Sequence, residues 1–330
     1  MQFLNEKNRV IFLALLYCLS FFYLISSVQR FFLENDPGIS LYFQYANQVF
    51  SHKIPYYDFM FEYPPFSLLF MLLPRVLGSC YSEYGLIFLL MIAIAGLLGL
   101  FITADIVKNR KGRFFAPISY ILLFIAVGPL TFFRYDLLPA IMTLLAIWLW
   151  INRHKKSAWF VIGLAVATKI YPLVIMPFFL VDDFKNVKQK IYDFSFFLLA
   201  IAISILPFIA HLNDLKKFIA YHSARGIQIE SLWANFLMIE HLIDRSVLRV
   251  ISEAGTFGVS PFPKIFIPLS LIIFFVGFLL IFLSYLKKKK KIILHSFLAV
   301  LLFILANKVF SPQYMIWLVV LFQNVVILSL

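Results

Sequence analysis

Ten apolar segments divide this chain, and they limit its fold more than any other feature. They lie near residues 10–27, 84–107, 114–131, 136–152, 157–169, 171–182, 192–210, 264–286, 292–308 and 312–330. Hydrophobic residues make up 62% of the chain and charged residues only 14%, which is typical of proteins embedded in hydrocarbon. Within lipid an open sheet leaves its edge groups without hydrogen-bond partners. We therefore predict one all-α, polytopic membrane domain over residues 1–330.

Two neighbouring segments, 157–169 and 171–182, are shorter than the roughly 20 residues that a spanning helix needs. We expect them to form a broken, half-spanning hairpin that stays within the protein. Residues 66–77 are also apolar and short, and Pro64-Pro65 favours a new helix there. We expect this helix to lie along the membrane surface rather than cross it.

The Lys and Arg residues gather in short clusters between apolar segments, and these clusters indicate an orientation. With a cytoplasmic amino terminus, five clusters face inward, near residues 7–9, 108–113, 153–156, 185–190 and 287–291. Two long loops, 28–83 and 211–263, are then extracytoplasmic and are expected to carry surface helices. The net charge of +13 thus reflects topology, so we expect membrane lipid and no nucleic acid as a partner. We predict a multi-pass protein of a prokaryotic plasma membrane.

The cysteines and histidines give no sign of a metal centre. Cys18 and Cys80 are too few for a disulfide framework, and no second His or Cys lies at ligand spacing from His222. We expect no cofactor and no metal site, while a requirement for a divalent metal stays open.

The first outer loop holds four carboxylates beside aromatic residues, Glu34, Asp36, Asp58 and Glu62. Carboxylates fixed at a bilayer surface suggest proton or cation chemistry on a substrate that the membrane delivers. We assign the catalytic base to Asp36, which follows the first span closely. Asp36 could instead cap a helix that begins near Ile39, because Asp is favoured at that position and Pro often follows. Asp58 and Glu62 are rival bases, although their aromatic and proline neighbours suit folding of the loop.

Four basic residues fall on the same outer side: Arg134 between two spans, Lys169 at the hairpin break, Arg225 in the long loop and Lys308 between the last spans. Each could simply extend from a helix end to the interface, and Arg134 could pair only with Asp136. Together they suit stabilisation of a departing phosphate while a carboxylate takes the proton of an attacking hydroxyl. Nucleotide sugars stay in the cytoplasm, so an outward-facing transferase needs a sugar carried by a lipid.

Five further polar residues on this side are candidate substrate-binding residues, Tyr42, Tyr63, His222, Glu230 and Gln313. A plainer interpretation makes His222 an ordinary polar loop residue and Glu230 the start of a surface helix. The gathering of all these groups on one face favours a shared site.

Several motifs resemble glycosyltransferase family 87, whose members are polyprenol-phosphate-mannose-type transferases of the GT-C superfamily. They are Tyr42-x-x-Tyr45-Ala46, Ile54-Pro55-Tyr56-x-Asp58-Phe59-x-x-Glu62-Tyr63-Pro64-Pro65, Arg134-Tyr135-Asp136-Leu137-Leu138-Pro139, Thr168-Lys169-Ile170-Tyr171-Pro172, Arg225-Gly226-Ile227-Gln228-Ile229-Glu230-Ser231 and Ser311-Pro312-Gln313-Tyr314. The resemblance implies a GT-C-like bundle of about ten transmembrane or half-spanning helices, with juxtamembrane helices in the first outer loop. It also implies an inverting transferase with an essential acidic residue near the start of that loop. Asp36 matches this residue better than Glu34, although family members commonly place it four residues before the loop tyrosine and Asp36 lies six before Tyr42.

We therefore expect transfer of a hexose, with mannose as the expected sugar, from a polyprenyl-phosphate donor to a lipid or glycan acceptor at the outer face. A transporter or flippase for a lipid-linked glycan is the first alternative, and it would show inverted halves and charges near the membrane midplane. A non-catalytic subunit of a cell-envelope complex is the second. Such a subunit would have no need for Asp36, Lys169 and Lys308 to converge.

Overall fold

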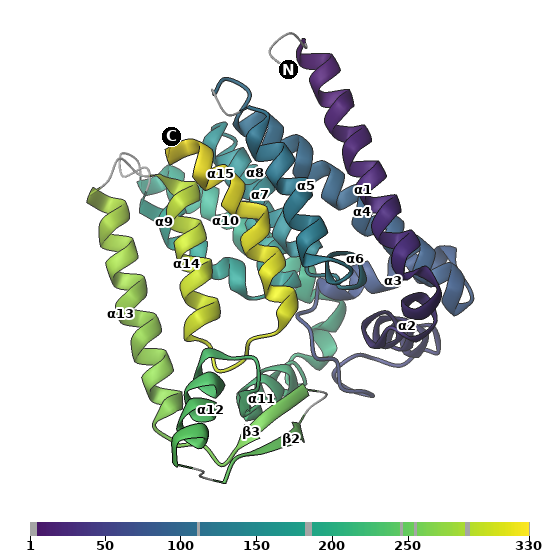
Figure 1. Ribbon diagram of the computed structural model, residues 1–330, viewed down its shortest axis with the longest axis vertical. Helices are drawn as coiled ribbons and strands as arrows, with labels where there is room; N and C mark the ends of the chain where they lie inside the picture. The colour runs from purple at the N-terminus through teal and green to yellow at the C-terminus, as the bar shows by residue number, and fades with distance from the viewer. Residues whose placement is uncertain are drawn as a thin grey trace.

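A bundle of helices forms the body of the protein (Figure 1). The computed structural model describes residues 5–110, 113–181, 187–244, 247–253, 256–287 and 291–329, without the side chains of 28–35, 253 and 326–329, so the Glu34 side chain lies outside the described part. Within that part, four helical stretches are long and apolar enough to cross a membrane: Glu6–Ser27, Tyr81–Ile106, Val187–His211 and Phe266–Lys287. They belong to the helices α1 (Glu6–Asn35), α4 (Tyr81–Ile106), α10 (Val187–Ile205) with η2 (Leu206–His211), and α13 (Phe266–Lys287).

Shorter helices complete the bundle, and the described part of every predicted apolar segment is largely helical. They are α5 (Phe115–Val127), α6 (Leu130–Phe133), α7 (Leu137–Ile151), α8 (Lys155–Thr168), η1 (Tyr171–Ile175), α9 (Met176–Val181), α14 (Ile292–Ala306), η3 (Pro312–Tyr314) and α15 (Met315–Ser329). The predicted break of the half-length hairpin is confirmed. Lys169 ends α8 in an extended conformation, with φ −156° and ψ 137°, and η1 begins two residues later with Pro172 in its first turn.

Small residues let the helices approach closely, as in other membrane bundles. A Cβ atom at Gly96 of α4 would lie 2.0 Å from the Tyr17 hydroxyl oxygen of α1. The hydroxyl of Tyr120 on α5 donates a hydrogen bond of 2.8 Å to the Gly96 carbonyl, which this close approach permits. Likewise a Cβ atom at Gly163 of α8 would meet the Ala200 methyl group of α10 at 2.7 Å.

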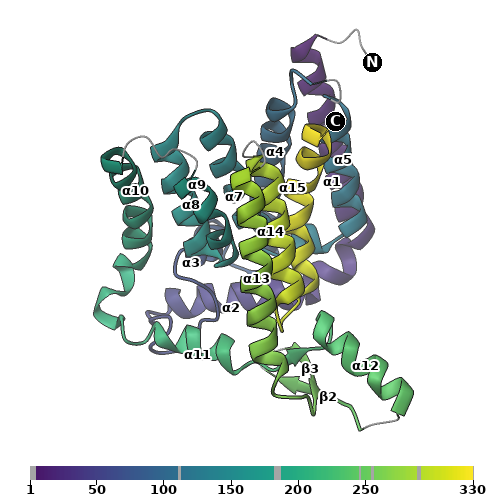
Figure 2. The same cartoon turned by 90° about the vertical axis from the view of Figure 1, so that its left-hand side faces the viewer.

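The two ends of the bundle differ in content (Figures 1 and 2). The first turn of α1, the end of α4, the start of α5 and the carboxyl end of α13 lie at one end, together with the described residues of the predicted inner clusters. The surface elements lie at the other end: α2 (Pro37–Phe50), α3 (Ser67–Leu77), α11 (Lys216–Ala224) and α12 (Leu232–Asp244). The residues predicted to form the site are at this second end.

A small sheet at the second end was not predicted from the sequence. Strands β1 (Ile227–Gln228), β2 (Arg249–Glu253) and β3 (Thr256–Ser260) pair antiparallel in the order β1-β3-β2. Ile227, Val259 and Trp233 of α12 form its core. The indole Nε1 of Trp233 donates to the Ala306 carbonyl at 2.9 Å, so the sheet and α12 are attached to the end of α14.

Candidate active site

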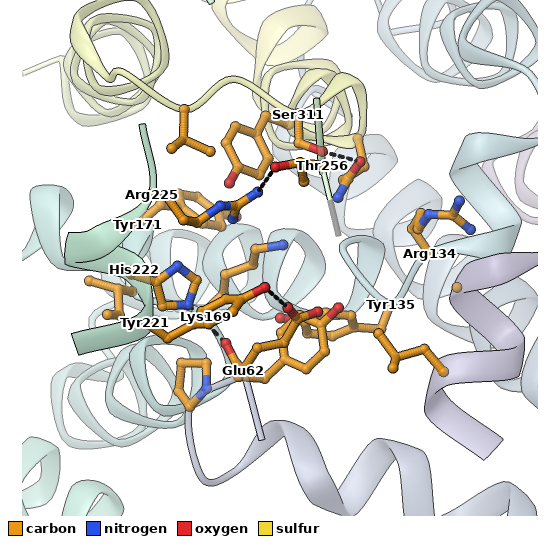
Figure 3. A pocket seen from close by; sticks show the side chains of 18 of the residues that line it. Glu62, Arg134, Tyr135, Lys169, Tyr171, Tyr221, His222, Arg225, Thr256 and Ser311 are labelled. Carbon is orange, nitrogen blue, oxygen red and sulfur yellow. Dashed lines mark hydrogen bonds between the residues drawn. The ribbon is translucent and has the colours of Figure 1, made fainter. Parts of the chain in front are cut away.

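A cavity of about 840 Å³ lies at this end of the bundle (Figure 3). Its wall is built from α2, the first outer loop, the residues after α6, the break after α8, α11 and the connection between α14 and α15. The four predicted phosphate-binding residues, Arg134, Lys169, Arg225 and Lys308, all line it. The fold therefore brings together basic groups that are up to 174 positions apart in the chain.

Lys169 is held in place by one carboxylate and three aromatic rings. Its Nζ donates to Asp136 Oδ1 at 2.5 Å, and the Nε1 of Trp317 donates to the same oxygen at 2.9 Å. The ammonium also lies 4.9 Å from the ring centre of Tyr135, 5.3 Å from Tyr314 and 5.2 Å from Trp317. Asp136 is only 1% exposed and does not line the cavity. Lys169 is thus fixed from behind while it borders the cavity.

Arg134 does not pair with Asp136, the neighbour that its sequence position suggests, but with Asp36. Its Nη1 donates to Asp36 Oδ1 at 2.8 Å and to Oδ2 at 3.0 Å. Asp36 is 3% exposed, and its Oδ1 also accepts the amide N–H groups of Gly38 and Ile39 at 2.9 Å, which caps α2. Both the cap and an ion pair are therefore present. Asp36 itself does not line the cavity, whereas Gly38 and Arg134 do.

Arg225 and Lys308 are held by uncharged oxygen atoms. The Nη2 of Arg225 donates to Thr256 Oγ1 at 3.2 Å (Figure 3). The Nζ of Lys308 donates to the carbonyl oxygens of Ser223 at 2.9 Å and of Arg225. Figure 3 shows Arg134 across the cavity from Arg225. Arg134 and Lys169 are thus each backed by a buried carboxylate, whereas Arg225 and Lys308 donate to hydroxyl and carbonyl oxygens.

Of the three rival bases, Glu62 lines the cavity. The Tyr221 hydroxyl donates to its Oε2 at 2.6 Å, and the His222 Nε2 lies 2.8 Å from its backbone carbonyl (Figure 3). Burial, and then the hydrogen bond to Glu62, raises the pKa of Tyr221, while burial lowers the pKa of His222. Both side chains are therefore neutral at physiological pH. Asp58 is turned away, because its Oδ2 accepts the Ile54 N–H at 2.7 Å and closes a turn of the loop.

Four of the five predicted substrate-binding residues line the cavity. Tyr42, Tyr63, His222 and Gln313 line the cavity, and Glu230 does not. The Ser311 hydroxyl donates to Gln313 Oε1 at 2.6 Å, which fixes the amide.

The sequence did not single out several wall residues, chiefly aromatic ones: Tyr135, Tyr171, Tyr221, Thr256, Tyr314 and Trp317. The rings of Tyr171 and Trp317 stack with centroids 4.0 Å apart. Tyr135, Tyr171 and Tyr314 stand inside motifs already noted, so their position beside Arg134, Lys169 and Gln313 was an available signal. Nothing in the sequence marks Thr256.

Groups of three or more His, Cys, Asp or Glu side chains able to hold a metal ion are absent from the described residues. This finding concerns preformed protein sites. It says nothing of a metal that arrives with a substrate.

Two comparisons with known proteins bear on this geometry. The family model described as glycosyltransferase family 87 matches residues 61–312. The fold is similar to the crystal structure of ArnT from Cupriavidus metallidurans in the apo state, with a TM-score of 0.50 and 13% sequence identity. The similarity covers 89% of this chain and 55% of the ArnT chain, so this chain spans about half the length of that protein. No curated protein sequence matches. The likeness to ArnT concerns the fold alone. The family model confirms the resemblance noted in the motifs.

Proposed function

Because the chain belongs to glycosyltransferase family 87, we propose that it transfers a hexose, with mannose as the sugar, from a polyprenyl-phosphate donor to a hydroxyl group of a lipid or glycan acceptor. The observation that most supports this proposal is the single cavity that four basic residues from distant segments line. Fixed cations around a shielded cavity stabilise the negative charge that develops on a leaving phosphate. The cavity also contains Glu62 and several tyrosines, which offer polar partners to a sugar.

In the proposed reaction, Lys169, Arg225 and Lys308 hold the donor phosphate, and Arg134 approaches it from the other side. The acceptor oxygen forms a bond to the anomeric carbon, while the bond from that carbon to the phosphate oxygen breaks. The electron pair of the broken bond leaves with polyprenyl phosphate, and the configuration of the sugar inverts. Each cation compensates part of the charge on the departing phosphate.

Asp36 is the proposed base that takes the proton of the acceptor hydroxyl. Its Oδ1 accepts three donors. Among the side chains that the structure describes, its Oδ2 accepts only Arg134 Nη1, so a lone pair remains for the proton. A phosphate near Arg134 would compete with Asp36 for the guanidinium and would uncover that oxygen. Catalytic contacts commonly tighten only when substrates bind, so burial in the unliganded protein is compatible with this role.

The decisive experiment is to incubate purified protein with a panel of polyprenyl-phosphate sugars and to measure released polyprenyl phosphate together with the glycosylated acceptor. Transfer from at least one donor is expected. A transporter would instead move a lipid-linked glycan across vesicles without cleaving it, and that result would overturn the proposal. The position of the charges favours the enzyme, because the cavity is lined by residues of α2, α11 and the connection between α14 and α15. These elements lie at one end of the bundle rather than at its middle (Figures 1 and 2).

We also propose that this end of the bundle is extracytoplasmic, since the basic clusters lie at the opposite end. Cysteines placed at Lys53 and Arg225, in a protein without Cys18 and Cys80, should react with an impermeant thiol reagent in intact cells. A cysteine at Lys155 should react only after lysis. Labelling of Lys155 in intact cells would reverse the assignment.

A further inference from the structure

Glu62 is a carboxylate in a cavity lined by four basic residues, yet it forms no ion pair among the residues that the structure describes. Asp36 and Asp136, which lie behind the wall, take up the positive charges of Arg134 and Lys169 instead. The carboxylate of Glu62 is directed into the cavity (Figure 3). A negative group in that position repels phosphate, so it marks the part of the cavity where the uncharged part of a substrate binds.

Two contacts with α11 fix the orientation of Glu62. The Tyr221 hydroxyl donates to Oε2 at 2.6 Å, and His222 contacts the backbone carbonyl at 2.8 Å. Tyr63 also forms a side-chain hydrogen bond with Glu62. A carboxylate has about four accepting sites, so with these two tyrosines Glu62 can still accept a further hydrogen bond. An ionised carboxylate accepts hydrogen bonds only, so the groups that suit it are hydroxyls.

The donor sugar is the substrate part that carries hydroxyls next to the phosphate. In Figure 3 Lys169 projects into the cavity between Arg225 and Glu62, and the charge of Glu62 acts electrostatically on Lys169. A hexose bonded to a phosphate at Lys169 and Arg225 would therefore extend toward Glu62. Tyr63 and Tyr135, whose ring centroids are 5.0 Å apart, offer apolar ring surface to its C–H groups.

We propose that Glu62, oriented by Tyr221, is a specificity-determining residue that accepts a hydrogen bond from a hydroxyl of the donor hexose. This assignment rests on the proposed function, in which a polyprenyl-phosphate sugar is the donor. It gives Glu62 a role different from that of Asp36, because Glu62 contacts a hydroxyl of the donor sugar and Asp36 takes the proton of the acceptor hydroxyl.

The test is a cycle between protein and substrate. The value of kcat/KM is measured for polyprenyl-phosphate mannose and for its single-deoxy analogues with wild type, Glu62→Gln and Tyr221→Phe. Sites built to bind a substrate hydroxyl strongly reject an analogue that lacks it. Wild type should therefore reject one analogue by about a hundredfold or more. Glu62→Gln should lower kcat/KM for the intact donor. It should also reduce the ratio of kcat/KM between the intact donor and that one analogue to about tenfold or less, while the ratios for the other analogues stay unchanged.

The exposed Glu240→Gln on α12 is the matched control and should keep every ratio. Tyr221→Phe should weaken the same rejection to an intermediate degree, because Glu62 then loses its orienting partner. Unchanged ratios in Glu62→Gln would overturn the assignment alone. A loss of discrimination that is confined to deoxy acceptors would also overturn it. The same holds if Glu62→Gln transfers no sugar while Asp36→Asn stays active. Absence of transfer by wild type with every donor would overturn the proposed function and this assignment with it.

Discussion

The cavity holds its four cations in two different ways. Arg134 and Lys169 each pair with a buried aspartate behind the wall, whereas Arg225 and Lys308 bind hydroxyl and carbonyl oxygens. A buried charge that loses its partner is costly, so the first two cations are fixed by the fold. Arg225, in contrast, donates to the Thr256 hydroxyl. The comparison indicates that Arg134 and Lys169 are tied to the folding stability of the cavity wall.

The largest expected effect comes from replacing Asp36, the ion-pair partner of Arg134. Asn is nearly isosteric with Asp, still caps a helix and still accepts a hydrogen bond from Arg134, so Asp36→Asn should fold and bind the donor. Its folding stability should fall, because Arg134 loses its counter-ion. Loss of the base should lower the transfer rate by about a hundredfold or more. The measurement is released polyprenyl phosphate under single-turnover conditions, with donor binding measured separately. Near-normal turnover, with Glu62→Gln or Asp58→Asn inactive but folded, would move the base to the second half of the loop.

A second test compares Lys169, which pairs with a buried aspartate, with Arg225, which donates to a hydroxyl. Lys169→Met and Arg225→Met should both slow transfer by about ten- to a thousandfold, because each removes a fixed charge from the phosphate. Only Lys169→Met leaves a buried carboxylate, Asp136, without its cation, which costs about 3–5 kcal/mol of folding stability.

Thermal unfolding in detergent measures the difference between these two variants. Adding Asp136→Asn to Lys169→Met should restore most of the lost stability but none of the activity, since Asn still accepts the Trp317 N–H. Equal destabilisation by Lys169→Met and Arg225→Met would show that pairing with a buried aspartate does not distinguish Lys169 from Arg225.

A smaller effect is expected at Gly38. An added Cβ atom would lie 2.4 Å from Arg134 Nη1, so Gly38→Ala must displace the guanidinium from its place beside Asp36. Transfer should fall roughly tenfold, less than the hundredfold that a misplacement of about 1 Å can cost. The shorter, more flexible side chain in the double variant Gly38→Ala with Arg134→Lys should recover part of the loss relative to Arg134→Lys alone. Full activity of Gly38→Ala would show that the position of Arg134 is unimportant.

The smallest expected effect is the contribution of His222 to the pH dependence of folding stability. Burial lowers the pKa of His222, and the nearby charges of Arg225 and Lys169 add to this while Glu62 opposes it. The unfolded chain therefore binds a proton at higher pH than the folded protein does. This contribution to stability is present above the unfolded pKa of about 6.5 and is lost as the pH falls through it. His222→Gln should flatten that part of the thermal midpoint profile between pH 7.5 and 5.5. An unchanged slope would exclude His222 as its source.

The sequence predicted the fold well because apolar length and charge clusters decide it. The broken hairpin at Lys169 followed from segment length alone. The sheet was missed because its strands have two to five residues, too few to show an alternating pattern.

Within the site, the sequence located the cations but not their partners. It suggested that Arg134 pairs with Asp136, two residues away, whereas the fold pairs Arg134 with Asp36 and Asp136 with Lys169. Residues two apart at the start of a helix point in different directions, so proximity in sequence misleads there. Tyr221 acts on Glu62 across 159 positions, a relation that no local pattern can reveal.

The cavity is completed by segments that come late in the sequence relative to the rest of its wall. Asp136 and Lys169 precede Trp317, whose indole N–H binds the same carboxylate oxygen, and the α11 region precedes Lys308, whose ammonium binds two of its carbonyl groups. Trp317 and Asp136 are 181 positions apart, so the wall of the cavity is complete only after α15 has packed against the rest of the bundle. A variant in which α15 fails to pack should lose the arrangement of the site although every polar residue is present.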